Sequence, residues 1–163
     1  RQLANTLHKD YIHESNLQDT VSQIAEACDA IVRSNMAETR RILDTLTTGY
    51  PLVLVSNFYG NIHAVLQSYG IDGYFKDVIE SAVVGIRKPD PQIFALGIEA
   101  LALSPDEVLV VGDSYSKDVI PAHSLGCHTI WLKGKGWNTS DESIDTPCAD
   151  RVIKHLAEVL ESV

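Results

Sequence analysis

Cysteines are scarce in this 163-residue sequence, which has three of them, all far apart in the chain. Cys28, Cys127 and Cys148 form no C-x-x-C pair, so they indicate neither a disulfide framework nor a thiolate zinc site. Apolar runs are short, because none approaches the ~18 residues that a membrane-spanning helix needs. The N-terminus also lacks the basic and then apolar layout of a signal peptide. These absences favour a cytoplasmic protein that is not anchored in a membrane.

Basic residues are outnumbered as well. Thirteen Lys and Arg face 22 Asp and Glu, which leaves a net charge of −9 at pH 7. A charge of this sign repels phosphate backbones and anionic lipid, so nucleic acid and membrane surfaces are disfavoured as partners. The histidines do not have the spacing of a metal-ligand set, and we expect them to lie on the surface or in the core.

The first third of the chain has apolar residues at steps of three and four, which is typical of amphipathic helices. The pattern predicts one helix over 17–31 and a second over 39–50. Asn35 followed by Glu38 resembles an N-cap with its reciprocal acid, so we expect the second helix to start there.

From Pro51 onward, short apolar runs alternate with helical patterns. The strongest runs, over 52–56 and 108–111, have the continuous apolar character of strands that are buried on both faces. Further strands are expected at 78–79, 127–132 and the start of 151–160, helices at 61–69, 90–101 and 116–125, and a polar loop at 134–147. The alternation predicts an α/β fold, a Rossmann-like parallel sheet with flanking helices and right-handed crossovers.

Polar residues follow the strands of this predicted sheet. Ser56 and Asn57 come directly after the first strand, Lys88 precedes the helix over 90–101, and Asp113 and Asp118 follow the strand over 108–111. Ligands of open α/β sheets bind outside the carboxyl ends of the strands, so we expect these side chains to meet in one crevice.

The chemistry of this set suits a phosphoryl group held beside Mg²⁺. The Ser56 hydroxyl can donate to phosphate oxygens, Lys88 supplies a compact positive charge, and Asp113 is a hard oxygen ligand for the metal. Asp118 can bind a metal-bound water or orient Lys88. Taken singly, each residue has a plainer reading, such as a helix cap, a solvated charge or a strand-end hydroxyl.

The order Ser-Asn, then Lys-Pro, then Gly-Asp-Ser-x-x-x-Asp resembles motifs two, three and four of the haloacid dehalogenase-like hydrolase superfamily. The resemblance covers about two thirds of the chain, from Leu52 to the C-terminus. It implies Mg²⁺-dependent hydrolysis of the phosphomonoester of a small metabolite through an aspartyl-phosphate. By the same resemblance Ser56 and Asn57 would bind the phosphorylated substrate, and Lys88 would stabilise the phosphoryl charge. Asp113 would be the metal ligand and Asp118 a supporting catalytic acid.

The sequence departs from the family at its first motif. That motif, Asp-x-Asp after an N-terminal apolar strand, supplies the nucleophile and the general acid, and it is absent here. Asp10 has neither an apolar run before it nor an acid two residues later. In the family's sheet the missing strand lies between the strands that end here at Ser56 and Gly112. We therefore expect the chain to be the C-terminal part of a longer enzyme, or to take this strand from another segment.

On this interpretation, residues 1–36 are the remainder of a helical cap that selects the substrate, and 37–163 are the α/β core without its first strand. Four other functions are considered. The missing nucleophile favours a catalytically inactive binding protein, and a sugar phosphomutase has the same fold. A dehalogenase is less favoured, because the metal-free dehalogenases of the superfamily do not use the ligand that Asp113 supplies. A phosphorelay receiver is ranked low. Its Lys comes in the last element, after the hydroxyl-bearing strand, whereas Lys88 here precedes the strand that ends before Asp113.

Overall fold

The protein is described by a computed structural model that covers residues 14–134 and 147–163. It forms two compact units, and the boundary between them falls inside helix α1, between Glu38 and Thr39. Asp10 and most of the polar loop predicted over 134–147 lie outside the described residues. The assignment of residues 1–36 to a cap stays a prediction.

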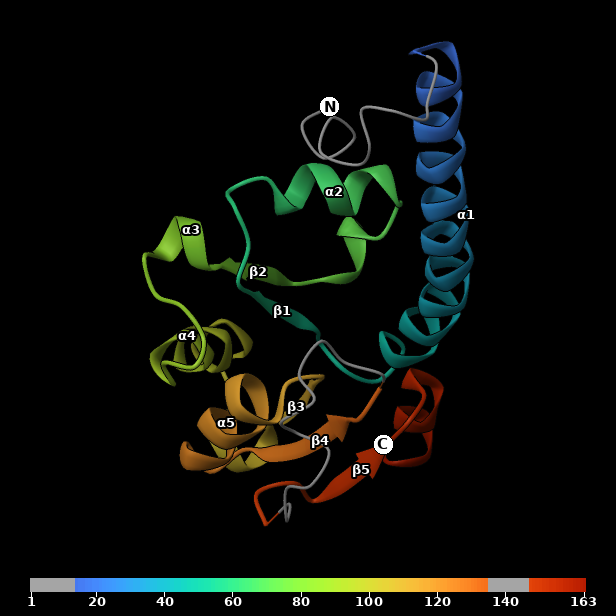
Figure 1. Cartoon of the computed structure of the whole chain (residues 1–163). Coiled ribbons are helices and arrows are strands. Elements are labelled where there is room, and N and C mark those ends of the chain that lie inside the picture. Colours follow the sequence, from blue (N-terminus) through green and yellow to red (C-terminus); the bar gives the residue numbers. More distant parts are fainter. Residues whose placement is uncertain (1–13, 135–146) are drawn as a thin grey trace. The chain divides into compact units, whose positions relative to one another are not determined.

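Helix α1 is a single element, Glu14–Leu46 (Figure 1). The prediction of two helices with an N-cap at Asn35 is therefore wrong. The segment contains neither Gly nor Pro, and an Asn in a helix interior costs only a few tenths of a kcal/mol, about 0.7 at most relative to Ala. That cost is too small to interrupt the helix. Its last turns belong to the second unit, where Ile42 and Leu43 are buried.

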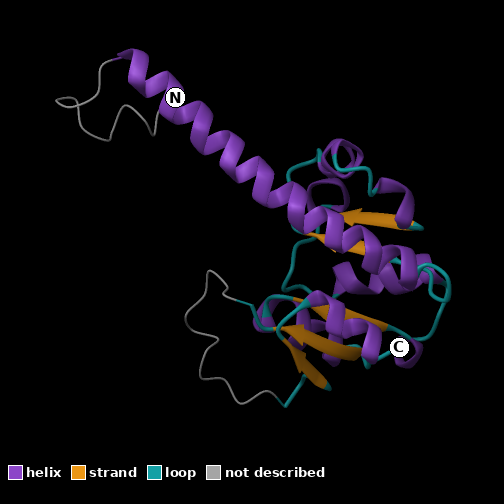
Figure 2. Cartoon of the chain, turned by 90° about the vertical axis from the view of Figure 1, so that its right-hand side faces the viewer, coloured by secondary structure: helices purple, strands orange, loops and turns teal. Residues whose placement is uncertain are grey.

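The second unit contains two parallel sheets. Strands β1 (Val53–Ser56) and β2 (Asp77–Glu80) form one pair, with Ser56 opposite Glu80. Strands β3 (Leu109–Gly112), β4 (His128–Leu132) and β5 (Arg151–Ile153) form the other sheet in that order. Figure 2 shows the strands, in orange, as these two groups. The predicted α/β fold with parallel strands and flanking helices is confirmed.

Short helices connect the strands. They are α2 (Ile62–Ser68), η1 (Asp72–Tyr74), α3 (Ser81–Val84), α4 (Gln92–Leu101), η2 (Pro105–Glu107), η3 (Tyr115–Val119), α5 (Ile120–Ser124) and η5 (Leu156–Glu161). The single helix predicted over 116–125 is divided, because η3 is one turn of π-helix and α5 is an α-helix. Pro121 lacks the N–H that a regular α-helix would donate back to Lys117, which explains the irregular first turn.

One apolar core underlies both sheets. Ile93, Phe94 and Ile98 of α4 are buried in it, and Val53 and Val110 pack against it from β1 and β3. Helix α4 lies close to β1, since a Cβ added to Gly97 would be 3.1 Å from Cγ2 of Val55. The core thus joins the two sheets into one unit although β1 and β3 are not paired with each other.

A cleft separates β1 from β3. Its volume is about 180 Å³, and both strands, α4, Lys88 and Asp118 line it. The residues of β1 are only partly buried, although the sequence predicted a strand covered on both faces. The difference arises because β1 pairs with β2 alone and its other edge borders the cleft. No helix among the described residues is long and apolar enough to cross a membrane.

Candidate functional site

An ion pair between the half-buried Lys88 and the buried Asp118 lies at the carboxyl ends of the strands. Nζ of Lys88 is 2.7 Å from Oδ1 of Asp118, and the two side chains are 17% and 5% exposed. The second oxygen of Asp118 accepts a hydrogen bond from the backbone N–H of Ser114 at 3.0 Å. Burying two charges is costly unless they are paired and hydrogen-bonded, and such pairs add little net stability. The pair is therefore better explained by a function of its charges than by stability.

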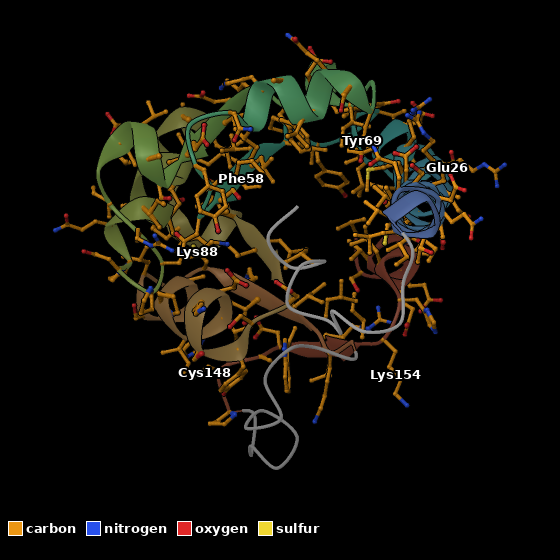
Figure 3. All side chains as sticks on the ribbon, turned by 45° about the horizontal axis from the view of Figure 1, so that its top comes forward. Glu26, Phe58, Tyr69, Lys88, Cys148 and Lys154 are labelled. Atoms are coloured by element: carbon orange, nitrogen blue, oxygen red, sulfur yellow. The ribbon has the colours of Figure 1, made fainter. Side chains whose placement is uncertain are left out.

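Asn57 fixes the backbone of Lys88. Its Nδ2 donates to the Lys88 carbonyl at 3.1 Å, and its Oδ1 accepts from the Lys88 N–H at 2.9 Å. Both ends of the amide are used in this way, so the geometry favours a positioning role over the substrate contact predicted from the motif. Figure 3 shows Lys88 near the loop of Phe58, the residue after Asn57.

The loop after β1 is also held by the last residue of β2, Glu80, and the first residue of α3, Ser81. The Ser81 hydroxyl accepts from the Phe58 N–H at 3.1 Å and donates to the Phe58 carbonyl at 3.2 Å. The carboxylate of Glu80, which is 3% exposed, accepts from the N–H of Gly60. Ser56, half-buried at the end of β1, thus begins a loop whose backbone is anchored at two points. Sequence reasoning missed Glu80 and Ser81, although an acid ending an apolar strand was a signal for a buried, bonded carboxylate.

Gly112 is required by the close approach of Asp118. A Cβ added to Gly112 would lie 2.2 Å from Cβ of Asp118, well inside van der Waals contact. The sequence suggested only a candidate motif at this position, whereas the structure gives its physical reason. The glycine lets η3 fold back over the end of β3 and bring Asp118 to Lys88.

Gly112→Ala is expected to displace Asp118 from Lys88, lowering the free energy of unfolding by about 2 kcal/mol through overpacking. Thermal unfolding measures the loss. Gly73→Ala is the matched control, because Gly73 has no atom within 4 Å of an added Cβ and no positive φ. Equal stability of the two variants would contradict the assignment.

Asp113 directly follows β3 and precedes Ser114, whose N–H bonds Asp118. Asp113 is exposed, and it takes part in none of the ion pairs found among the described residues. No group of three or more His, Cys, Asp or Glu that could hold a metal occurs in the described part of the chain. Mg²⁺ commonly binds one or two carboxylates and takes its other oxygens from water and phosphate. Asp113 therefore fits Mg²⁺ in kind, as one ligand of an incomplete set.

The structure brings the predicted residues to one edge of the unit through a continuous series of contacts. Asn57, next to Ser56, holds Lys88; Lys88 pairs with Asp118; and Asp118 bonds the residue that follows Asp113. These contacts connect the segments that carry the Ser56 hydroxyl, the Lys88 ammonium and the exposed Asp113 carboxylate, and Lys88 and Asp118 line the cleft. Such a set can bind an anion and stabilise added negative charge on it.

Comparison with known proteins gives a family match. Residues 3–126 match the family model described as "haloacid dehalogenase-like hydrolase". Two curated relatives are a glyceraldehyde 3-phosphate phosphatase of Pyrococcus furiosus and a phosphoserine phosphatase of Thermus thermophilus. The first is 33% identical over 56% of this chain and 38% of its own length. The second is 32% identical over 77% of this chain and 49% of its own length.

Solved structures agree with the sequence relatives. The crystal structure of a HAD phosphatase from Thermococcus onnurineus superposes with a TM-score of 0.65 and 32% identity. The superposition covers 75% of this chain and 54% of that protein. This chain spans about half or less of the length of the curated relatives that it matches.

Proposed function

Because this chain belongs to the haloacid dehalogenase-like hydrolases, we propose that it carries part of the active site of a phosphatase acting on a small phosphorylated metabolite. The observation that carries the proposal is the Lys88–Asp118 pair, whose carboxylate also bonds the N–H of Ser114, the residue after the exposed Asp113. The relatives named above are phosphatases of small metabolites, which supports this class of substrate. We expect the cap to select the metabolite, and residues 1–36 remain the candidate for the remainder of that cap.

Each residue has a distinct role in this proposal. The Ser56 hydroxyl donates to a phosphoryl oxygen, and the Lys88 ammonium stabilises the negative charge that grows there in the transition state. Asp118 holds Lys88 in place. Asp113 would hold Mg²⁺, and the chemistry that bound Mg²⁺ supplies is neutralisation of charge on the phosphoryl oxygens. Asn57 positions Lys88 through its backbone.

The nucleophile must come from outside the described elements. The cleft between β1 and β3 supports a specific source, because each strand is paired on one side and presents its other edge to the cleft. One extended strand, parallel to both, would satisfy the two edges at once. Its carboxyl end would emerge between Ser56 and Gly112, next to Lys88. An aspartate directly after such a strand would face the phosphoryl group and could attack it.

Intact mass under denaturing conditions tests this proposal first. We expect the purified active protein to contain a species heavier than 17.9 kDa, or a second short chain, that supplies the strand. A single species of 17.9 kDa that is an active phosphatase would contradict the inserted strand, because the nucleophile would then lie within the 163 residues.

A peptide can stand in for the strand. A run of four β-branched residues followed by Asp-x-Asp is expected to slow amide hydrogen exchange in β1 and β3. It should also confer Mg²⁺-dependent hydrolysis of p-nitrophenyl phosphate on the 163-residue chain. The control peptide has Pro inside the run, where it lacks the N–H that pairing needs. Equal protection by both peptides would contradict insertion as a strand.

A second candidate is a catalytically inactive binding protein. It is favoured by the incomplete metal-ligand set of the site, since the described residues contain no group of three or more His, Cys, Asp or Glu that could hold a metal. Calorimetry with inorganic phosphate separates the two functions. The binding protein binds phosphate but hydrolyses no ester even with the peptide present, whereas the phosphatase does both.

A further inference from the structure

The peptide unit between Asp113 and Ser114 is held at both of its ends. The indole Nε1 of Trp131, in β4, donates to the Asp113 carbonyl at 3.1 Å. The N–H of Ser114, on the same peptide plane, donates to Oδ2 of Asp118 at 3.0 Å. The side chains of Trp131 and Asp118, from different elements, thus both hydrogen-bond to the peptide unit that follows Asp113.

This double anchor fixes the backbone from which the Asp113 carboxylate extends. A peptide unit is planar, so two hydrogen bonds at opposite edges fix its orientation. On the other side of Asp113, Gly112 is in register with Trp131 in the β3–β4 ladder. The Cα of Asp113 is therefore fixed from before and after, and with it the direction of the Cα–Cβ bond. Only the side-chain torsions of Asp113 remain free.

Trp131 cannot turn its N–H away from this position. The residue is 2% exposed, and the Tyr115 ring packs on it with 5.2 Å between centroids. Nζ of Lys133 lies 4.8 Å from the centroid of the Trp131 ring. The Tyr115 hydroxyl, in turn, accepts from the N–H of Cys148 at 3.1 Å. A buried Trp needs a partner for its N–H, and the only acceptor bonded to it in the described residues is the Asp113 carbonyl.

We propose that Trp131 is a positioning residue of the site, whose indole N–H directs the carboxylate of Asp113 toward a divalent cation. The proposal rests on the proposed function and extends it, since Trp131 touches neither cation nor substrate. Hydrogen bonds run from Trp131 through the Asp113–Ser114 peptide to Asp118 and on to Lys88. Binding of a cation at Asp113 is therefore expected to change the environment of the Trp131 indole in β4.

The test uses NMR of the 163-residue chain titrated with Mg²⁺ alone. In a Trp137→Phe background the Trp131 indole gives the single indole N–H signal, since the sequence has two Trp. We expect the indole hydrogen of Trp131 to exchange slowly with solvent. Its signal should shift together with that of the Ser114 amide as Mg²⁺ binds. Replacing the Trp131 indole by benzothiophene keeps the ring shape and removes the N–H. This replacement is expected to raise the half-saturating Mg²⁺ concentration at Ser114 by about tenfold.

Trp131→Phe is a second variant that removes the same donor, and Thr129→Val is the matched control. Thr129 is also buried in β4, and its hydroxyl donates to the Cys148 carbonyl and not to Asp113. The control is expected to lose stability without changing the Mg²⁺ dependence. If both Trp131 replacements titrate like the wild type, the positioning role is overturned and the proposed function stands. If the wild-type Ser114 amide does not respond to Mg²⁺ even with the Asp-x-Asp peptide present, both are overturned.

Discussion

Lys88→Ala is expected to lower phosphatase turnover by two to three orders of magnitude, about the effect of removing a single charge-stabilising donor from an active site. The ammonium of Lys88 is the cation that the described residues bring to the mouth of the cleft, and its position is fixed twice. Asn57 holds its backbone, and Asp118 holds its side chain. The measurement is kcat for the complete protein at saturating Mg²⁺.

The same substitution is also expected to cost stability. Asp118 would stay buried without its partner, and breaking a buried pair in this way costs about 3 kcal/mol or more. Thermal unfolding therefore accompanies the kinetics, so that lost fold is not mistaken for lost chemistry. Lys117→Ala is the control, because Lys117 is an exposed lysine of η3, next to Asp118 in the chain. A Lys88→Ala variant with wild-type turnover would show that Lys88 is not part of the catalytic site.

Asp113→Asn is expected to have the second large effect. The substitution removes a negative charge from the proposed Mg²⁺ ligand while keeping its shape, so the Mg²⁺ requirement should rise at least about tenfold. Turnover should fall by about three orders of magnitude, because the phosphoryl charge is then poorly neutralised. Asp113 is exposed, so the stability should change little. Turnover is measured as a function of Mg²⁺ concentration.

Asp106→Asn provides the control for this experiment. Asp106 is an exposed acid of η2, outside the site, and its loss changes the net charge by the same amount. An Asp113→Asn protein with the wild-type Mg²⁺ dependence would rule out Asp113 as the ligand. The two large effects differ in kind, since raising Mg²⁺ should partly restore Asp113→Asn and should leave Lys88→Ala unchanged.

The site residues were accessible to sequence reasoning because their positions are set locally. Ser56 and Asp113 each follow an apolar run, and in a parallel sheet the ends of such runs gather at one edge. The separate role of each residue could not be predicted from the sequence. Asn57 belongs to the same motif as Ser56, yet both ends of its amide bind Lys88, 31 residues away. That pairing depends on how two loops pack, which no local pattern encodes.

Local patterns also failed where two local signals competed. Asn35 and Glu38 have the spacing of a helix start, but α1 runs through them because nothing in the segment breaks the helix. In the same way, the apolar run of β1 predicted a strand covered on both faces. Its partial burial follows from the cleft beside it, a property of strand order rather than of the run itself.

The sequence by itself determined the α/β class, the approximate places of the strands, and the residue types available for chemistry. These features follow from apolar periodicity and from the side chains at strand ends, which act over a few residues. Only the tertiary structure decided that β1 and β3 face each other across a cleft, that Asp118 holds Lys88, and that Trp131 grips the peptide after Asp113. The physical reason is that these contacts join segments far apart in the chain, whose meeting is fixed by packing of the shared core.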